Sequence, residues 1–479
     1  MSEIELLVIS PLLVLAGAVV VVMLVAAFVR RSVVTAVLTL VGLVAAFAML
    51  FLVWSEVPRQ VTPLLVMDGY AIFYLGLLLA TAFVVVVQGY GYWRAWSGDS
   101  HAFYILLLLA TLGTAVLVTS SHFASFFLGL ELLSISLYGL IAYTRQSKER
   151  VEAGLKYLIL AGTTSAFLLF GMALIYAELG TMQLAEIGAE ISAVPRNLIF
   201  IFGIGLLLVG IAFKLALVPF HLWTPDVYQG APAPVTGFVA TVSKGGMFVL
   251  LLRYFGEWEL LDDGRITGGF TIIAIASMLV GNLLAVRQDN VKRILAYSSI
   301  AHLGYLLIPF IAFNEQTMQA AAFYLVAYFV TTLCAFGVVA LLSRPEEERE
   351  ALSDYAGLFW QRPYLSTVFM LALLSLAGLP PLAGLVGKIY LALAGIESGL
   401  WLLLVVLVLA SLIGVYYYTR IILVMVRRVE GEGEGTAVTA TLSSPAGVVL
   451  VLLALLLVVL GLYPSPLIEL ITAIIPGLT

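Results

Sequence analysis

Long apolar runs separated by short polar stretches fill almost the whole chain. A spanning helix needs about 20 mostly apolar residues, and on that criterion the pattern predicts an all-α membrane protein with about fourteen transmembrane helices. They are expected at residues 5–29, 32–54, 67–90, 102–120, 122–143, 155–178, 197–220, 232–255, 266–286, 291–312, 317–342, 364–396, 399–427 and 447–475. The longest polar stretches, 343–363 and 428–446, are too short for a soluble domain, so residues 1–479 form a single membrane domain in this interpretation. The first of them is compatible with a short surface helix.

Two predicted helices carry proline in mid-sequence. The seventh contains Pro219, and the twelfth contains Pro380 and Pro381 within the stretch LAGLPPLAG. Proline removes a backbone donor and breaks a helix, and inside a membrane freed backbone groups are tolerated only against protein or a wet cavity. Ordinary proline kinks, which are common in membrane helices, are the alternative explanation.

The spacing of the two breaks indicates an internal repeat. The broken helices are five apart, and an odd offset turns the second copy upside down. Helices 4–8 (102–255) and helices 9–13 (266–427) are therefore predicted to be inverted five-helix repeats, flanked by 5–90 and 447–475. Transporters built in this way place their sites near the middle of the membrane.

Composition agrees with a bilayer as the solvent. Of the 479 residues, 62% are hydrophobic and 11% charged, whereas soluble chains have about 25% charged residues. The net charge of −5 gives no reason to expect nucleic acid as a partner. The lone Cys334 excludes a disulfide framework, a cysteine-rich zinc site and an iron–sulfur cluster held by this chain alone.

The basic residues predict the orientation. The chain starts with Glu3 and Glu5, and Arg30 and Arg31 follow the first apolar run, which is unlike a cleavable signal peptide. With the N-terminus outside, most loop arginines and lysines fall on the inner side, as the positive-inside rule requires. The outer segments then hold only Arg59, Arg196, Arg253 and Arg265. The C-terminus is also expected outside.

Charged side chains recur inside the predicted helices, where each costs about 2.5–3.5 kcal/mol on insertion scales. Lys244 lies about twelve residues into its helix, which is about 18 Å at 1.5 Å per residue and close to mid-membrane. The others are Glu131, Lys214, Lys388 and His302. An ammonium group removed from water tends to lose its proton, and a nearby carboxylate opposes that loss. These residues therefore predict a proton path.

In that path Glu131 and Lys214 form a switchable pair, Lys244 is the central carrier and Lys388 passes protons to the outer side. Static ion pairs are the alternative, but no second buried acid besides Glu131 is expected among helices 4–13, and one carboxylate cannot match three lysines. Lys156 and His221 are weaker, supporting candidates near membrane ends. Paired axial histidines for haem are not expected, and no metal or cofactor site is predicted in this chain.

Four sequence stretches resemble one membrane-protein family. They are PFHLWTPDVYQGAPAPVT (219–236), VSKGG (242–246), VKRILAYSSIAHLG (291–304) and the LAGLPPLAG break. Together they resemble the antiporter-like membrane subunits of bacterial NADH-quinone oxidoreductase (complex I), and among them the subunit N family. The larger subunits and Mrp-type antiporters carry a histidine near helix 8 where this chain has Ser243-Lys244.

The resemblance implies a proton-translocating subunit in the membrane arm, within the bacterial plasma membrane. By motif position, the essential charges of the family fall on Glu131, Lys214, Lys244 and Lys388. It also implies quinone reduction, FMN and iron–sulfur clusters in other subunits, because this chain has no dinucleotide or nucleoside-triphosphate motif. Expected partners are other antiporter-like and small membrane subunits, the lipid bilayer and, indirectly, the peripheral arm. An autonomous Mrp-like cation/proton antiporter and an inert spacer subunit remain the alternatives.

Overall fold

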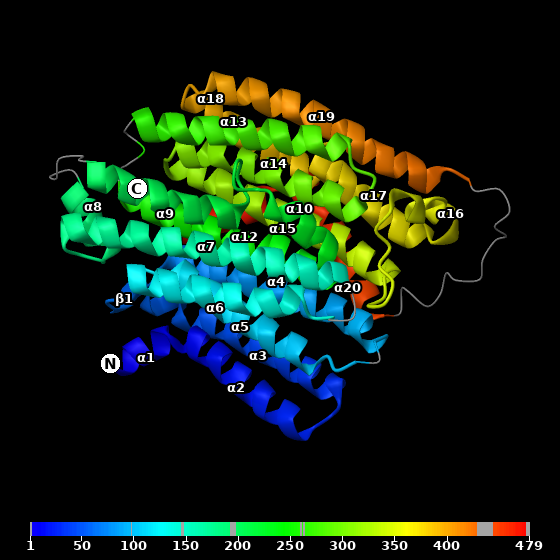
Figure 1. Ribbon diagram of the computed structural model, residues 1–479, viewed down its shortest axis with the longest axis horizontal. Helices are drawn as coiled ribbons and strands as arrows, with labels where there is room; N and C mark the ends of the chain where they lie inside the picture. The colour runs from blue at the N-terminus through cyan, green and yellow to red at the C-terminus, as the bar shows by residue number, and fades with distance from the viewer. Residues whose placement is uncertain are drawn as a thin grey trace.

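The protein is a bundle of long helices lying side by side, as seen in a computed structural model (Figure 1). The structure describes residues 2–96, 98–144, 148–191, 198–258, 261, 264–428 and 444–475. In these residues, 13 helices are long and apolar enough to cross a membrane, and the broken pair α17 and α18 adds one more crossing to give the predicted set. The acidic loop expected at 428–446 lies largely outside the described residues.

The long helices follow the predicted ranges closely, whereas the short elements between them were not predicted. In chain order they are α1 (Glu3–Val8), α2 (Ser10–Phe28), α3 (Ser32–Val53), η1 (Trp54–Glu56), β1 (Arg59–Thr62), β2 (Leu65–Met67), α4 (Gly69–Arg94), α5 (His101–Thr119), α6 (Phe123–Ile141), α7 (Lys148–Leu179), α8 (Leu184–Ile191), α9 (Leu198–Leu215), α10 (Trp223–Gly230), α11 (Ala233–Phe238), η2 (Val239–Ser243), α12 (Lys244–Glu257), α13 (Gly264–Val286), α14 (Val291–Ile311), α15 (Glu315–Leu342), η4 (Leu352–Tyr355), α16 (Leu358–Gln361), α17 (Pro363–Ala377), α18 (Ala383–Glu397), α19 (Trp401–Val426), α20 (Pro445–Leu462) and α21 (Ser465–Ile474).

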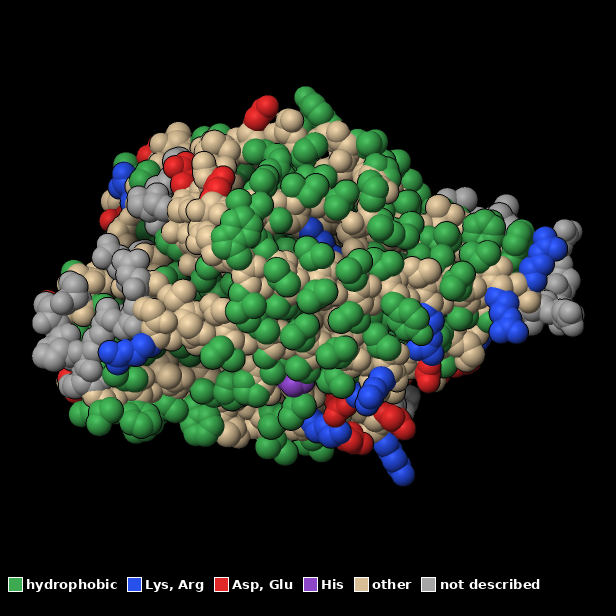
Figure 2. Space-filling model, turned by 90° about the horizontal axis from the view of Figure 1, so that it is seen from above, with side chains coloured by type: hydrophobic (Ala, Val, Ile, Leu, Met, Phe, Trp, Pro, Cys, Tyr) green, Lys and Arg blue, Asp and Glu red, His purple; other side chains and the backbone are tan. Residues whose placement is uncertain are grey.

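Three helices form the centre of the bundle. The span Ala233–Gly256 is buried along nearly its whole length, as are α14 and α15. In contrast, α2 and α7 expose most of their side chains, which are largely apolar. Figure 2, seen from the side where α13, α18 and α19 lie in Figure 1, shows another largely apolar face, with most charged side chains toward its edges. Because the central helices do not face lipid, polar side chains on them lie against protein.

The two predicted five-helix sets have the same order of neighbours. In the first set α5 packs along α6, and α7 packs against both α9 and α10. In the second, α13 packs along α14, and α15 packs against both α17 and α18. The last helix of each set packs against the first, since α12 contacts α5 and α19 contacts α13. The inverted relation between the two sets remains a prediction that this common order supports.

The two ends of the bundle are closed differently. At one end, β1 and β2 form an antiparallel hairpin that the sequence reading missed. At the other end, residues 343–357, here called the strap, cross the bundle between α15 and α16. The backbone of the strap bonds to the turn before α14, where the Val291 amide donates to Glu350 and the Leu352 amide donates to Asp289. The short helix with which 343–363 is compatible is confined to η4 and α16, because the part before them pairs with a neighbouring turn instead.

The last predicted crossing, 447–475, is also two helices rather than one. Helix α20 ends at Leu462, and α21 begins at Ser465 after Pro464. Proline cannot continue a helix from the preceding turn, so the chain changes direction there.

Candidate functional site

The first break lies between α9 and α10, and it leaves backbone carbonyls at the end of α9 without a partner in their own helix. Helix α9 ends at Leu215, and Ala216 has φ +59°, a left-handed conformation that is uncommon for a residue with a Cβ atom. The indole nitrogen of Trp223, the first residue of α10, donates to the Phe213 carbonyl over 2.8 Å. A side chain from beyond the break therefore caps α9.

Lys214 sits in the last turn of α9 and is 3% exposed. Its Nζ donates to the Tyr157 hydroxyl over 2.8 Å and to Ser134 Oγ over 3.1 Å. Both partners are neutral hydroxyl groups from neighbouring helices. The ammonium group is thus held by side chains that can also accept or pass on a proton.

Glu131 lies on α6, one turn before Ser134, and its Oε1 accepts a hydrogen bond of 2.6 Å from Ser165. Both Glu131 and Lys214 are described residues, and they make no ion pair with each other within 4.0 Å. The static-pair alternative is therefore not found for these two groups. The switching of this pair stays a prediction.

Lys244 is the first residue of α12 and follows the π-helical turn η2. Such turns are frequent at functional sites. Lys244 is 1% exposed, and its Nζ donates to Ser299 Oγ over 2.8 Å. The ammonium group also lies over the rings of Tyr228 and Trp223, 5.1 and 5.8 Å from their centroids. Aromatic faces attract cations without supplying a counter-charge.

Ser299 connects Lys244 to the second half of the bundle. Its Oγ accepts a 2.8 Å hydrogen bond from the Tyr328 hydroxyl and lies 3.3 Å from the Tyr228 hydroxyl. The Tyr328 ring packs against the His302 ring with centroids 5.5 Å apart. His302 Nδ1 lies 2.6 Å from the Tyr324 hydroxyl, so the predicted histidine is buried among hydroxyl groups.

The second break lies between α17 and α18, where Gly378 has φ +83°. Lys388 Nζ reaches back from α18 and donates to the carbonyls of Leu376 and Ala377 over 3.1 and 3.0 Å. It also lies 5.3 Å from the centroid of the Tyr305 ring. The lysine itself therefore caps the broken helix.

These groups are here called the polar row, which is defined as Lys214, Tyr157, Lys244, Ser299, Tyr328, His302 and Lys388. Between Lys214 and Lys244, the rings of Tyr157 and Trp223 pack with centroids 4.9 Å apart. Hydroxyl and imidazole groups both donate and accept hydrogen bonds. Buried ammonium groups without a carboxylate partner favour their neutral form more than exposed ones do. The chemistry of the polar row suits proton transfer.

The supporting candidates lie apart from the polar row. Lys156 is 44% exposed and pairs with Glu152 and Asp226 at 2.8 and 2.9 Å, so it belongs to a surface network. His221 is buried in the first break, and its Nδ1 has no hydrogen-bond partner among the described residues.

Sequence reasoning missed several members of the site. Ser299, Tyr324 and Tyr328 carry no charge, and the two tyrosines lie on α15 rather than on the helix of His302, so no sequence signal joins them to it. It also missed Glu348, a buried carboxylate on the strap, which is 4% exposed and contacts Lys292. The adjacent acidic residues make this segment look solvent-exposed, and no sequence signal separates Glu348 from them.

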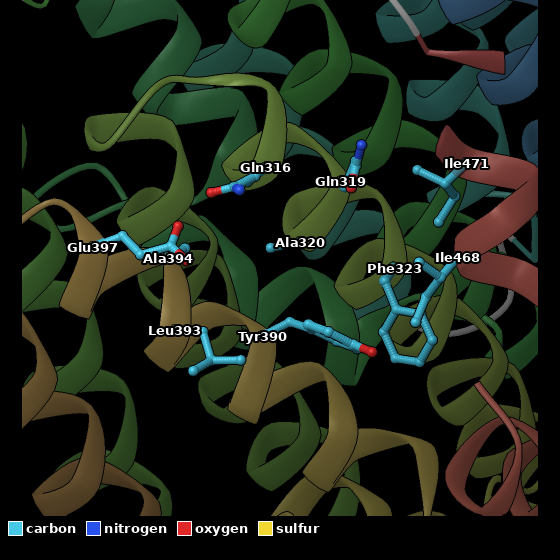
Figure 3. A pocket seen from close by; sticks show the side chains of 10 residues that line it. All are labelled: Gln316, Gln319, Ala320, Phe323, Tyr390, Leu393, Ala394, Glu397, Ile468 and Ile471. Carbon is cyan, nitrogen blue, oxygen red and sulfur yellow. The ribbon is translucent and has the colours of Figure 1, made fainter. Parts of the chain in front are cut away.

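A separate pocket lies between α15, α18 and α21, against the half of α18 that is farther from the second break (Figure 3). Gln316, Gln319 and Glu397 supply its polar side chains, and Phe323 and Tyr390 supply two aromatic rings. Lys388 does not line it. In the described residues no three His, Cys, Asp or Glu side chains gather as a metal site would require.

The chain matches known proteins over its whole length. Residues 120–414 match the family model described as NADH:quinone oxidoreductase/Mrp antiporter, TM. The NADH-quinone oxidoreductase subunit N of Nitrosospira multiformis is 51% identical over 88% of this chain and 86% of its own. A chain in respiratory complex I from Thermus thermophilus with bound aureothin is 34% identical, with a TM-score of 0.81 over 96% of this chain and 98% of its own. A chain of the Mrp complex from Dietzia sp. is 20% identical, with a TM-score of 0.84 over 99% of this chain and 97% of its own, and shows the same fold alone.

Proposed function

Because this chain belongs to the NADH:quinone oxidoreductase/Mrp antiporter family, within its subunit N branch, we infer that it translocates protons in the membrane arm of an NADH-quinone oxidoreductase. It is an integral membrane protein that assembles with other membrane subunits of the complex. We place it in the bacterial plasma membrane with both termini outside, on the distribution of arginine and lysine.

One observation carries the assignment of the path to particular residues. Lys214, Lys244 and Lys388 are buried, and the hydrogen bonds of their ammonium groups go to neutral oxygens. A permanent charge at this depth is costly, and a group that alternates between charged and neutral forms avoids holding that charge throughout. We therefore assign proton transfer to Glu131, Lys214, Lys244 and Lys388, with His302 between the last two.

The driving reaction is assigned to partner subunits. Moving one charge against about 100 mV requires about 2.3 kcal/mol, so transport needs an energy source. The chain has no dinucleotide fingerprint, and we propose that it carries no redox centre and acts as part of a translocase. FMN, iron–sulfur clusters and quinone are proposed to act in other subunits. Conformational changes in those subunits are proposed to be transmitted to this chain.

An autonomous cation/proton antiporter is the second candidate, since the fold is shared with an Mrp complex. Two observations weigh against it. The relative that is 51% identical bears the name of an NADH-quinone oxidoreductase subunit. A hard cation such as sodium favours several oxygen ligands including carboxylates. The centre of the polar row is instead the Lys244 ammonium group, which is hydrogen-bonded to Ser299.

Substitution of Lys244 tests the proposal. Lys244→Ala removes the carrier, and Lys244→Arg retains a charge that is not released in proteins. Both variants are expected to assemble, as measured by native gel electrophoresis, while proton pumping in membrane vesicles falls at least tenfold. Electron transfer from NADH to a soluble acceptor at the peripheral arm serves as the control. Normal pumping by Lys244→Ala would show a spacer role instead.

A further inference from the structure

The strap places one acidic side chain inside the bundle. The side chain of Glu348 is 4% exposed, whereas that of the adjacent Glu347 is 71% exposed. The Glu348 carboxylate accepts hydrogen bonds of 2.5 Å from Lys292 Nζ and from the Tyr92 hydroxyl. Arg150 lies 3.6 Å from the same carboxylate. Elements α4, α7 and α14 thus converge on a single residue of a loop.

The Lys292–Glu348 pair also holds the corner between α10 and α11. Lys292 Nζ donates to the carbonyls of Gln229 and Ala231, over 2.8 and 2.6 Å, at the end of α10. Glu348 Oε1 accepts from the Ala233 amide, over 3.0 Å, at the start of α11. The cation therefore binds the carbonyls before the corner, and the anion binds the amide after it.

This corner is connected to Lys244 along two routes. Tyr228, two residues before Gly230, places its ring under the Lys244 ammonium group. Ser299, which accepts the Lys244 hydrogen bond, lies seven residues after Lys292 on α14, about 10 Å along the same helix at 1.5 Å per residue. Both elements that contact the Lys244 ammonium group are thus joined to each other by Lys292 and Glu348.

A buried ion pair is weak evidence for stability, because apolar side chains of similar size often serve as well or better. Its geometric effect is specific here, since four hydrogen bonds fix the relative position of α10, α11 and α14. We propose that Glu348 is a positioning residue of the Lys244 site, acting through Lys292 to hold Tyr228 and Ser299 around the ammonium group. This inference rests on the proposed function of Lys244.

The test uses the full complex in membrane vesicles, with pumping expressed per assembled complex. Glu348→Gln is expected to lower pumping at least tenfold, and Glu348→Asp, which retains the charge, is expected to recover part of it. Glu347→Gln is the matched control from the same loop, and it should pump at the normal rate. Normal pumping by Glu348→Gln would overturn the proposal.

A double variant separates positioning from assembly. Glu348→Gln leaves Lys292 without its counter-charge, which by itself can prevent assembly. Glu348→Gln combined with Lys292→Met removes both charges and is expected to assemble but still pump at least tenfold less than the wild type. Recovery of both assembly and pumping would mean that the pair only balances charge, and failure of the double variant to assemble would mean a structural role. Either result overturns the proposal.

Pumping by Lys244→Ala is measured in the same vesicles, so that failure of the proposed function can be distinguished from failure of the positioning role. If Lys244→Ala abolishes pumping and Glu348→Gln does not affect it, the proposed function stands and the positioning role fails. If Lys244→Ala pumps normally, the proposed function itself fails.

Discussion

The two helix breaks occupy equivalent places in the two predicted repeats, yet they use their lysines differently. At the first break the Trp223 indole caps α9, which leaves the Lys214 ammonium group to the hydroxyls of Tyr157 and Ser134. At the second, Lys388 itself bonds the carbonyls at the end of α17. Loss of a proton at Lys214 leaves the cap of its helix intact. Loss of a proton at Lys388 weakens the cap, because a charged donor bonds a carbonyl more strongly than a neutral one.

Removing each lysine gives the largest expected difference. Lys214→Met and Lys388→Met should both lower pumping at least tenfold. Lys388→Met should also destabilise the complex more than Lys214→Met does, by roughly 1–3 kcal/mol, because buried backbone carbonyls lose their donor whereas hydroxyls can turn to other partners. The measurement is thermal denaturation of the purified complex. Equal melting temperatures for the two variants would remove the distinction between the breaks, and Lys388→Arg, which retains a charged donor, serves as the control for stability.

Each break contains one residue with a left-handed backbone conformation, Ala216 or Gly378. Substituting these residues should change the stability of the complex by a smaller amount, and with opposite sign at the two breaks. Ala216→Gly relieves a conformation that costs an L-residue about 1–2 kcal/mol and should stabilise the complex or leave it unchanged. Gly378→Ala introduces that strain, and its Cβ would also lie 2.8 Å from Lys388 Cδ and 3.1 Å from Nζ. It should therefore destabilise the complex and lower pumping. The same thermal and vesicle assays apply, and a stable, active Gly378→Ala would contradict the close fit around Lys388.

The smallest expected effect concerns Trp223. Trp223→Phe retains the ring and removes the N–H group, which should cost about 1 kcal/mol for one lost hydrogen bond. The first break then lacks its independent cap. Adding Lys214→Met to this variant is expected to destabilise the complex by more than the sum of the single changes, as a double-mutant cycle would show. Strict additivity would mean that Trp223 and Lys214 act separately.

The fold could be predicted in detail because the bilayer imposes long apolar segments. The predicted limits of helices such as 291–312 and 317–342 differ by a few residues at most from α14 and α15. The breaks were also predictable, since proline acts locally. The hairpin formed by β1 and β2 was not, because it is short and its pairing depends on neighbouring loops.

The site could be predicted only as far as charge marks it. Lys214, Lys244 and Lys388 are recognisable because a lysine in an apolar run is costly. Their partners are not, since Ser134 lies 80 residues from Lys214 and Ser299 lies 55 residues from Lys244. Serine and tyrosine are ordinary in such helices, and only packing selects the ones that touch an ammonium group. Glu348 was missed although it is charged, because in the sequence it resembles the exposed acidic residues beside it.

The hydroxyl of Ser299 has a consequence for direction. A serine oxygen accepts through two lone pairs and donates one proton. With Lys244 and Tyr328 both donating to it, its own proton has to point at Tyr228. A neutral Lys244 that turns its lone pair toward Ser299 forces that proton to rotate, and the neighbouring hydroxyls reorient in turn. The orientation of these O–H bonds therefore depends on whether the central amine carries its extra proton.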